Sequence, residues 1–283
     1  EDLKEVAAVP ELSELSKTLY IPLVGRIYAS RHYPSMIHDP KALGLESSLP
    51  EDAATMNRGQ NEYTMVSSVA RSVNMDRRIR SFLAAHPDAA VVSVGCGLET
   101  TYWRCDNGRA LWFELDLPEV IDMRRRLLGE GERNRTIAAS ALDPTWPDQL
   151  TADAPGGVLV VVEGLTMYLV EDEVRGLMEI IAAGLPGATV LIEFMPRLFQ
   201  RYGRERSVRG TGARFTYGCS DADEFRRAVA PEYALLHDVP FTDTIARFRP
   251  HLAPFLGLPP ARRLSPRILV MRAPRRRPVA AAA

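Results

Sequence analysis

Two glycines and one acid stand where a parallel α/β fold would bring them together. Gly95 and Gly97 follow a short apolar run, Ala89–Val94, which is rich in β-branched residues and too short for a helix. Such a run is typical of a buried parallel strand that leads into a tight turn. Asp116 follows a second apolar run, Ala110–Phe113, and in a βαβ unit its carboxylate would lie beside the glycine turn. This spacing predicts a site that grips a ribose diol.

The third position of the glycine pattern separates two kinds of nucleoside ligand. A dinucleotide fingerprint has a third glycine there, which lets the following helix pack close to the strand. Thr100 occupies that position here. The pattern therefore favours a nucleoside without a diphosphate, of which S-adenosylmethionine is the commonest. An NAD-dependent oxidoreductase is the second interpretation, and a third is that the glycines only form a strand-to-helix turn.

Composition and charge argue against several other classes of protein. The chain has 283 residues, of which 46% are hydrophobic and 25% are charged, as in an ordinary globular protein. A formal net charge of -1 gives no basic excess for phosphates, so no nucleic-acid partner is expected. The three cysteines lack C-x-x-C spacing, which predicts neither disulfides nor a metal site and favours a cytoplasmic location. A charged start and short apolar runs predict no membrane segment.

Apolar periodicities predict strands that alternate with helices, which is typical of a Rossmann-like α/β fold with a doubly wound, mostly parallel sheet. Further helices are expected over residues 10–31, with Pro22 as a kink or break, 61–85, 118–128, 170–185 and 221–229. Further strands are expected over 135–139, 157–162, 188–194, 233–239 and 267–271. The charge run Arg124–Arg126 is interpreted as a solvent-exposed helix face.

The expected organisation is one elaborated domain. Residues 1–60 form an N-terminal helical cover, residues 61–273 form the core, and residues 274–283 are a tail. Within the core, residues from about 195 to 216 are rich in arginine and glycine, which fits a mobile lid over the site. A plain solvated loop is the alternative interpretation of that segment.

Four segments, taken in order, resemble the leucine carboxyl methyltransferase family, and within it the bacterial tetracenomycin-type polyketide O-methyltransferases. The segments are Val94–Arg104, Phe113–Pro118, Ser140–Asp143 and Glu163–Leu169. The resemblance spans residues 61–194 and implies a Rossmann-like methyltransferase that uses S-adenosylmethionine. The position after the third strand is an Asp-Leu pair in eukaryotic members and Ser140-Ala141 here. That departure points to the bacterial natural-product branch and away from a phosphatase C-terminus as substrate.

The resemblance also implies roles for individual residues. Arg71 would hold the methionine carboxylate of the cofactor, Glu163 its amino group and Asp116 the ribose. Each pairing is chemically sound, because a guanidinium binds a carboxylate and a carboxylate binds an ammonium or a diol. The expected cofactor-binding residues are Arg71, Gly95, Cys96, Gly97, Asp116, Leu117, Ser140, Ala141, Leu142, Glu163 and Gly164.

The expected acceptor is a small-molecule secondary metabolite, methylated on a carboxyl or hydroxyl oxygen. A carboxylate is ionised at neutral pH and needs no general base, whereas a phenol or enol more often does. His32 and Tyr168 are the candidate catalytic groups, and both have structural or substrate-wall roles as alternatives. The candidate substrate-binding residues are Tyr168, Arg26, Arg31, Arg197 and Arg214, of which the arginines would suit an anionic acceptor. A non-catalytic partner subunit with a methyltransferase fold is a further interpretation.

Overall fold

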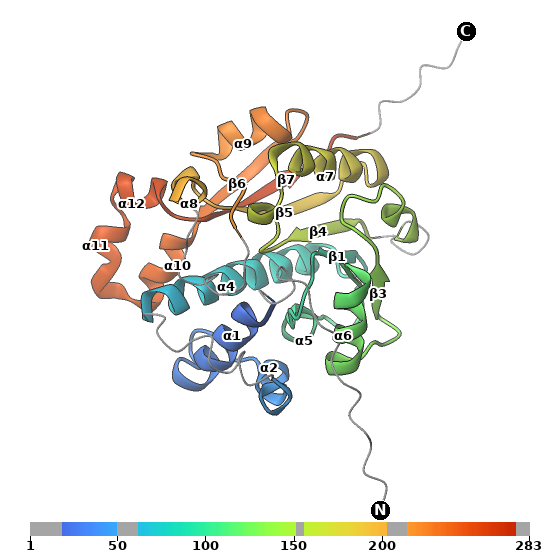
Figure 1. Ribbon diagram of the computed structural model, residues 1–283, viewed down its shortest axis with the longest axis horizontal. Coiled ribbons are helices and arrows are strands. Elements are labelled where there is room, and N and C mark those ends of the chain that lie inside the picture. Colours follow the sequence, from blue (N-terminus) through green and yellow to red (C-terminus); the bar gives the residue numbers. More distant parts are fainter. Residues whose placement is uncertain (1–18, 50–61, 151–155, 203–213, 276–283) are drawn as a thin grey trace, which may run out of the picture.

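A seven-stranded sheet forms the centre of the computed structural model, which describes residues 19–49, 62–150, 156–202 and 214–275 (Figure 1). In these residues the strand order is β3-β2-β1-β4-β5-β7-β6. The strands β1 to β5 run parallel, β7 runs antiparallel to β5, and β6 runs antiparallel to β7. The sheet therefore confirms the predicted doubly wound, mostly parallel α/β fold. The strands are β1 Ala90–Val94, β2 Leu111–Asp116, β3 Asn134–Ala138, β4 Val158–Val162, β5 Thr189–Phe194, β6 Ala234–Pro240 and β7 Arg267–Arg272.

The chain reverses its direction of travel across the sheet between β1 and β4. From β1 it proceeds to β2 and β3 on one side, and it then returns to place β4 and β5 on the other. Open α/β sheets bind ligands at such a switch point, outside the carboxyl ends of the strands. Residues 95–100 follow β1 and residues 163–165 follow β4, so both predicted site segments lie at this edge.

Helices cover both faces of the sheet because its central strands are apolar on both sides. Val92 and Val160 pack on the side of α7 (Glu171–Gly184) and α9 (Ala222–Val229). Val91 and Leu159 pack on the side of α4 (Glu62–Ala85) and α10 (Phe241–Phe248). This alternation is the two-residue period of a strand buried on both faces. Figure 1 shows α4 on one side of the sheet and α7 and α9 on the other.

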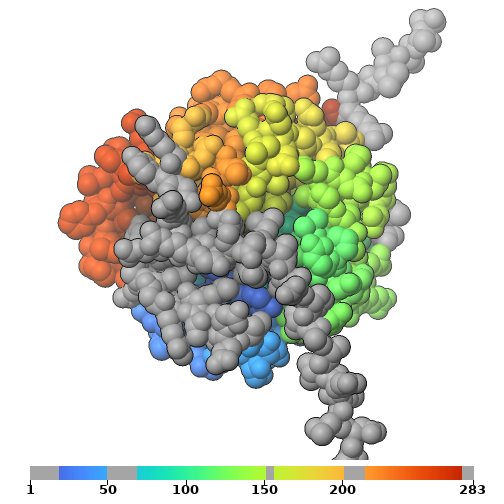
Figure 2. All heavy atoms as spheres, in the orientation of Figure 1, coloured from blue at the N-terminus to red at the C-terminus, as the bar shows by residue number. Residues whose placement is uncertain are grey.

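The described part of the N-terminal cover consists of α1 (Tyr20–His32), α2 (Pro40–Gly44) and a short 3₁₀ turn, η2 (Glu46–Ser48). In Figures 1 and 2 this cover (blue) lies at the opposite end of the molecule from α9 (orange). Pro22 lies in the first turn of α1, where its missing N–H costs nothing, so it does not interrupt the described part of this helix. The predicted kink or break at Pro22 stays a prediction for the longer helix. Residues 10–18 of the predicted helix lie outside the described residues.

The remaining elements include one group of helices that the periodicity did not predict. Residues 241–263, between β6 and β7, form α10, η7 (Pro250–Leu252), α11 (Ala253–Leu256) and α12 (Pro259–Arg263). The predicted lid contains α8 (Arg197–Tyr202), while residues 203–213 lie outside the described part. In the described ranges, no helix has the length and apolar character needed to cross a bilayer. The other short elements are α5 (Thr101–Cys105), α6 (Pro118–Leu128), η3 (Trp146–Gln149) and η5 (Thr166–Tyr168).

Candidate active site

The turn after β1 takes a shape that requires glycine at two positions. Gly95 has φ +69° and Gly97 has φ +48°, in the left-handed region that side chains disfavour. The N–H groups of Gly95 and Cys96 both donate to the carbonyl oxygen of Leu115 on β2, at 2.8 and 3.1 Å. A Cβ atom on Gly97 would lie 2.7 Å from the Leu19 side chain, so the cover reaches this turn. Burial raises the pKa of the Cys96 thiol well above its usual range.

Asp116, the last residue of β2, is joined to the glycine turn directly. Its Oδ2 accepts from the Gly97 N–H at 2.7 Å, and its Oδ1 accepts from the Leu117 N–H at 2.8 Å. Burial raises the pKa of Asp116, and the two N–H donors oppose that rise. Each oxygen accepts one bond here and has a second lone pair for a ligand hydroxyl. The structure thus brings together the turn and the acid that the sequence spacing predicts.

A second cluster lies where β4 ends and α4 passes over it. Arg71 Nε donates to Glu163 Oε1 at 2.9 Å, and the Ser72 hydroxyl donates to the same oxygen at 3.0 Å. Gly164 follows with φ +69°, and a Cβ atom there would lie 3.3 Å from Arg71 Nη1. Glycine is therefore needed both for the turn and for the guanidinium beside it. Arg71, Glu163 and Gly164, which are far apart in sequence, meet as predicted.

Glu193 on β5 belongs to the same cluster, although the sequence analysis did not single it out. Its Oε2 accepts from the Gly164 N–H at 2.8 Å and lies 3.7 Å from Arg71 Nη1. Glu99 also acts on Arg71, and the three carboxylates raise the pKa of Arg71 against the effect of its burial. An acid near the carboxyl end of a buried strand was the signal that could have identified Glu193, as it did for Glu163.

The cluster carries more negative than positive charge. Burial raises the pKa of Glu163 to about 7; the neighbouring Glu99 and Glu193 also raise it, and Arg71 lowers it. A carboxylate with such a pKa lacks sufficient positive charge around it. An ammonium or sulfonium group would supply that charge, so the residues present fit a cationic ligand at this edge of the sheet.

A network of buried ions connects the glycine turn to the cover. Arg104 on α5 donates to both oxygens of Asp76 at 2.8 and 2.9 Å and to Asp39 at 2.8 Å. Arg26 on α1 pairs with Glu99 and lies 3.3 Å from Asp39. Arg26 is only 1% exposed, so the expectation that it meets substrate at the mouth is wrong. Its guanidinium is occupied by carboxylates inside the protein.

Ser140, Ala141 and Leu142 form the loop after β3, at the same edge of the sheet as Asp116. The Ser140 hydroxyl accepts from the Leu142 N–H at 3.2 Å, and its carbonyl accepts from the Asp143 N–H at 3.0 Å. Ser140 is exposed, while Ala141 and Leu142 are half-buried. The loop is thus a compact turn next to the Asp116 strand, and its role in reading a base stays a prediction.

Comparison with known proteins agrees with this geometry. The sequence profile of the family described as "Leucine carboxyl methyltransferase" matches residues 22–182. The tetracenomycin polyketide synthesis O-methyltransferase TcmP of Streptomyces glaucescens is 30% identical over 209 residues, which are 73% of this chain and 76% of that protein. The chain belongs to the leucine carboxyl methyltransferase family. Its cofactor is S-adenosylmethionine.

More distant relatives and solved structures agree with the methyltransferase fold. The S-adenosyl-L-methionine-dependent methyltransferase dpfgK of Gibberella zeae is 25% identical over 238 residues, covering 77% of this chain and 80% of that protein. A DUF574 family protein from Streptomyces avermitilis has a TM-score of 0.53 at 17% identity, over 88% of this chain and 97% of that one. An S-adenosylmethionine-dependent methyltransferase from Mesorhizobium loti has a TM-score of 0.50 at 17% identity, over 69% of this chain and 96% of that one.

In this family member, the segment after Gly164 turns toward the predicted lid. Tyr168 in η5 meets Phe215 edge to face, with ring centroids 5.6 Å apart. The Thr216 N–H donates to the carbonyl oxygen of Met167 at 2.7 Å, which fixes residues 214–216 beside η5. Arg214 is exposed at the start of this segment. Tyr168 therefore lies in the segment that follows Glu163 and Gly164, and Arg214 directly precedes the residues bonded to that segment.

The other predicted acceptor residues lie on the surface. His32 is exposed at the end of α1, and its ring lies 4.1 Å from that of Tyr28. Arg31 is exposed and pairs with Glu46, and Arg197 is exposed and pairs with Glu224. None of these contacts joins them to the Glu163 cluster. Their roles in acceptor binding stay predictions.

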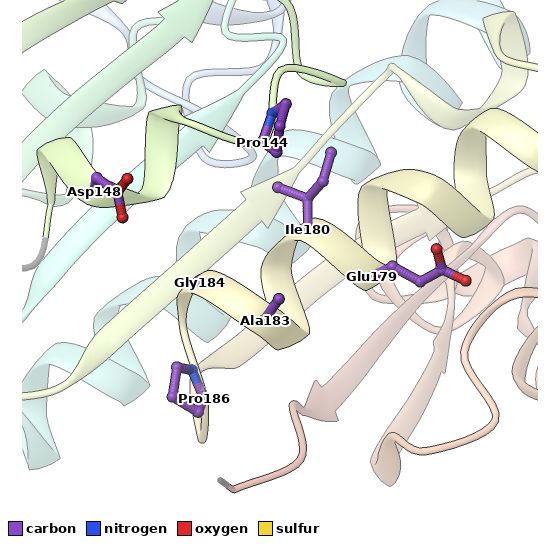
Figure 3. Close-up of a pocket in the computed structure, with 7 residues that line it drawn as sticks. All are labelled: Pro144, Asp148, Glu179, Ile180, Ala183, Gly184 and Pro186. Atoms are coloured by element: carbon purple, nitrogen blue, oxygen red, sulfur yellow. The ribbon is translucent and has the colours of Figure 1, made fainter.

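A surface groove lies apart from the predicted residues. It has a volume of about 820 Å³ and is formed by α7 and the segment around η3 (Figure 3). Its lining residues are Pro144, Asp148, Glu179, Ile180, Ala183, Gly184 and Pro186, none of which was a site candidate. Across the described ranges, no group of three His, Cys, Asp or Glu residues is arranged to hold a metal ion.

Proposed function

We propose that this protein transfers the methyl group of S-adenosylmethionine to a carboxyl oxygen of a small-molecule secondary metabolite with a polyketide-like skeleton; a hydroxyl acceptor is the alternative. The name of the 30% identical relative, an O-methyltransferase of polyketide synthesis, supports both the oxygen acceptor and its class. The cofactor supplies a methyl group already bonded to a sulfonium leaving group. Three buried, unpaired cysteines support a cytoplasmic location for the reaction.

The chain's own residues hold the two ends of the cofactor. Asp116 accepts from the ribose hydroxyls, Arg71 donates to the methionine carboxylate, and Glu163 pairs with the amino group. The bond from Gly97 to Asp116 and the bond from Arg71 to Glu163 support these roles, because each acid is held in place by a neighbouring donor. A ligand held at both ends has its methyl group fixed in direction, and such alignment provides much of the rate of an in-line displacement.

The histidines are the observation that favours a carboxyl acceptor. All five histidines of the chain are exposed, and they lie on the cover, before β1, on β6 and in η7. A phenol has a pKa of about 10 and needs a base within hydrogen-bonding reach, most often an imidazole. Glu163 is committed to Arg71 and Ser72. An acceptor that is ionised at neutral pH, such as a carboxylate, needs no such base.

Arg214 is our candidate for recognising the acceptor carboxylate. It is exposed and adjoins Phe215, whose ring contacts Tyr168 next to the cofactor segment. We expect Arg214→Met to raise the KM for a carboxylic acceptor about tenfold, the loss of one charge-assisted pair. The affinity for S-adenosylhomocysteine should not change. Arg109→Met is the control, because Arg109 is also exposed but pairs with Asp88 and precedes β2, at the opposite edge of the sheet from the site.

The direct test uses cofactor with a radiolabelled methyl group and pairs of aromatic polyketide acceptors. One member of each pair carries a free carboxyl group, and the other carries its amide beside the same phenol. We expect label only in the first member, and release of the label by mild base, because methyl esters hydrolyse under conditions that leave aryl ethers intact. Base-stable label in the amide would assign the reaction to a hydroxyl group. No label with any oxygen acceptor would contradict the proposal.

A further inference from the structure

Three successive carbonyl groups of the cofactor turn are bound by arginines. Arg124 Nη1 donates to the carbonyl oxygens of Gly97 and Glu99, at 2.9 and 2.7 Å. Arg26 Nη2 donates to the carbonyl between them, that of Leu98, at 2.9 Å. These carbonyls lie just before α5, so the turn's shape depends on donors from other elements.

Arg124 is held in position by β2. It is fully buried on α6, and its Nη2 lies 3.1 Å from Oε1 of Glu114, which is equally buried. The guanidinium also lies over the ring of Trp103, 5.9 Å from its centroid. The expectation that the run Arg124–Arg126 forms an exposed face is therefore wrong for its first member. Burying a charged pair is costly, which is a reason to look for what this one does.

Arg124 and Asp116 hold the same residue from opposite ends. The Gly97 N–H donates to Asp116, and the Gly97 carbonyl accepts from Arg124. Glu114 and Asp116 are two residues apart on β2, so one strand positions both the ribose acid and the arginine that fixes the turn. Without Arg124, the Gly97 peptide could rotate and the turn would no longer match Asp116.

We propose that Arg124 is a positioning residue for S-adenosylmethionine: it holds the Gly97–Glu99 backbone in its binding shape, and Glu114 holds Arg124. The role depends on cofactor binding beside Asp116 and not on the acceptor. A failure of the acceptor assay would therefore leave it intact, and its own test uses binding alone.

The test compares calorimetric binding of S-adenosylhomocysteine with thermal stability in four variants. Arg124→Lys keeps the charge beside Glu114 but lacks the fork that reaches two carbonyls, so affinity should fall about fivefold with little loss of stability. Arg124→Met leaves Glu114 without its cation, so both the affinity for S-adenosylhomocysteine and the thermal stability should fall. The double variant E114L/R124M replaces the pair with apolar side chains of similar size, which often preserves stability. Arg125→Met, at the exposed neighbour that pairs with Glu130, is the control.

The double variant separates positioning from a purely structural role. We expect it to melt within a few degrees of the wild type and still to bind S-adenosylhomocysteine at least tenfold more weakly, a loss of about 1.4 kcal/mol. Wild-type affinity in the double variant would overturn the proposal. If the double variant does not fold, Arg124→Lys decides: unchanged affinity in that variant overturns the proposal equally, and Arg125→Met should match the wild type throughout.

Discussion

Glu163 should make the cofactor-free protein less stable as the pH rises, and Glu163→Gln should remove that effect. Its carboxyl group is buried beside Arg71 and close to Glu99 and Glu193, and its pKa is raised from 4.5 to about 7. Between these two values the folded chain binds a proton that the unfolded chain has released. The unfolded state then binds fewer protons than the folded state, so the free energy of unfolding falls with increasing pH.

The size of the effect follows from the pKa rise. A change from 4.5 to about 7 corresponds to about 3 kcal/mol, at roughly 1.4 kcal/mol for each pH unit. The stabilisation by the protonated form is complete below pH 4.5 and is lost by pH 7. Glutamine has the same shape as the protonated acid and can still accept from Ser72. E163Q should therefore equal the wild type near pH 4.5 and exceed it by about 3 kcal/mol at pH 8.

Urea denaturation of both proteins without cofactor, from pH 4.5 to 8, measures this difference. Glu179→Gln, on the exposed face of α7, is the control and should track the wild type at every pH. In parallel, the affinity of the wild type for S-adenosylhomocysteine should rise between pH 5 and 7, as Glu163 becomes able to pair with the ligand ammonium. A stability difference that does not change with pH, or an E163Q protein that is less stable at pH 8, would refute the reasoning.

Three further changes test other parts of the site. Asp116→Asn should weaken S-adenosylhomocysteine binding about a hundredfold, because it removes the charge from two ribose hydrogen bonds. Its melting temperature, measured by calorimetry, should stay near that of the wild type. An affinity within threefold of the wild type would contradict this prediction. Gly97→Ala should lower both stability and affinity, because a Cβ atom there strains the backbone at φ +48° and meets the Leu19 side chain of the cover. Gly108→Ala is the control: it has φ +79° and open space around it, so it should add backbone strain alone, at about 1 kcal/mol. Equal losses of stability in the two variants would exclude contact with the cover. Arg104→Met should cost about 3 to 5 kcal/mol in urea denaturation, because it removes the guanidinium that donates to the buried carboxylates of Asp76 and Asp39. Arg109→Met removes an exposed pair and should cost less than 1 kcal/mol.

The sequence was sufficient for the sheet and for the residues that end its strands. Runs such as residues 89–94 and 157–162 are apolar on both faces, and this pattern fixes buried parallel strands with little dependence on the rest of the chain. Because parallel strands end at one edge, Gly95, Asp116 and Glu163 had to come close together. The positions of the residues that we propose for the cofactor follow from that geometry.

The buried ion pairs could not be read in the same way. Arg124 stands in a polar run on α6, and its burial depends on Glu114 on β2 and on the carbonyls of the turn after β1. A glutamate inside an otherwise apolar strand was the available signal, since such an acid needs a buried cation. Arg26 became interior because Asp39 and Glu99 meet it there. Pairings between distant elements depend on the assembled tertiary structure, which local patterns do not encode.

The helices over residues 241–263 were missed for a different reason. Only α10 has the length and the one-sided apolar pattern of an ordinary helix, while η7, α11 and α12 each span three to five residues and contain or follow prolines. Proline favours the first turn of a helix but also marks loops, so the local signal is ambiguous. These helices are held by packing, as the contact of Ile245 with the α4 side of the sheet indicates.

Arginines and acids bind different backbone groups of the turn after β1. Arginines bind its carbonyl groups, while Asp116 binds one of its N–H groups and Glu163 follows the neighbouring strand. The backbone carbonyls are thus satisfied within the protein, and the surplus of carboxylate lies near Arg71 and Glu163. A neutral nucleoside would leave that surplus uncompensated, whereas a cationic amino-acid tail compensates it. If Arg71 and Glu163 hold the amino-acid tail as we propose, the acids that destabilise the empty protein at neutral pH should also favour a sulfonium cofactor, and binding should offset their cost in stability.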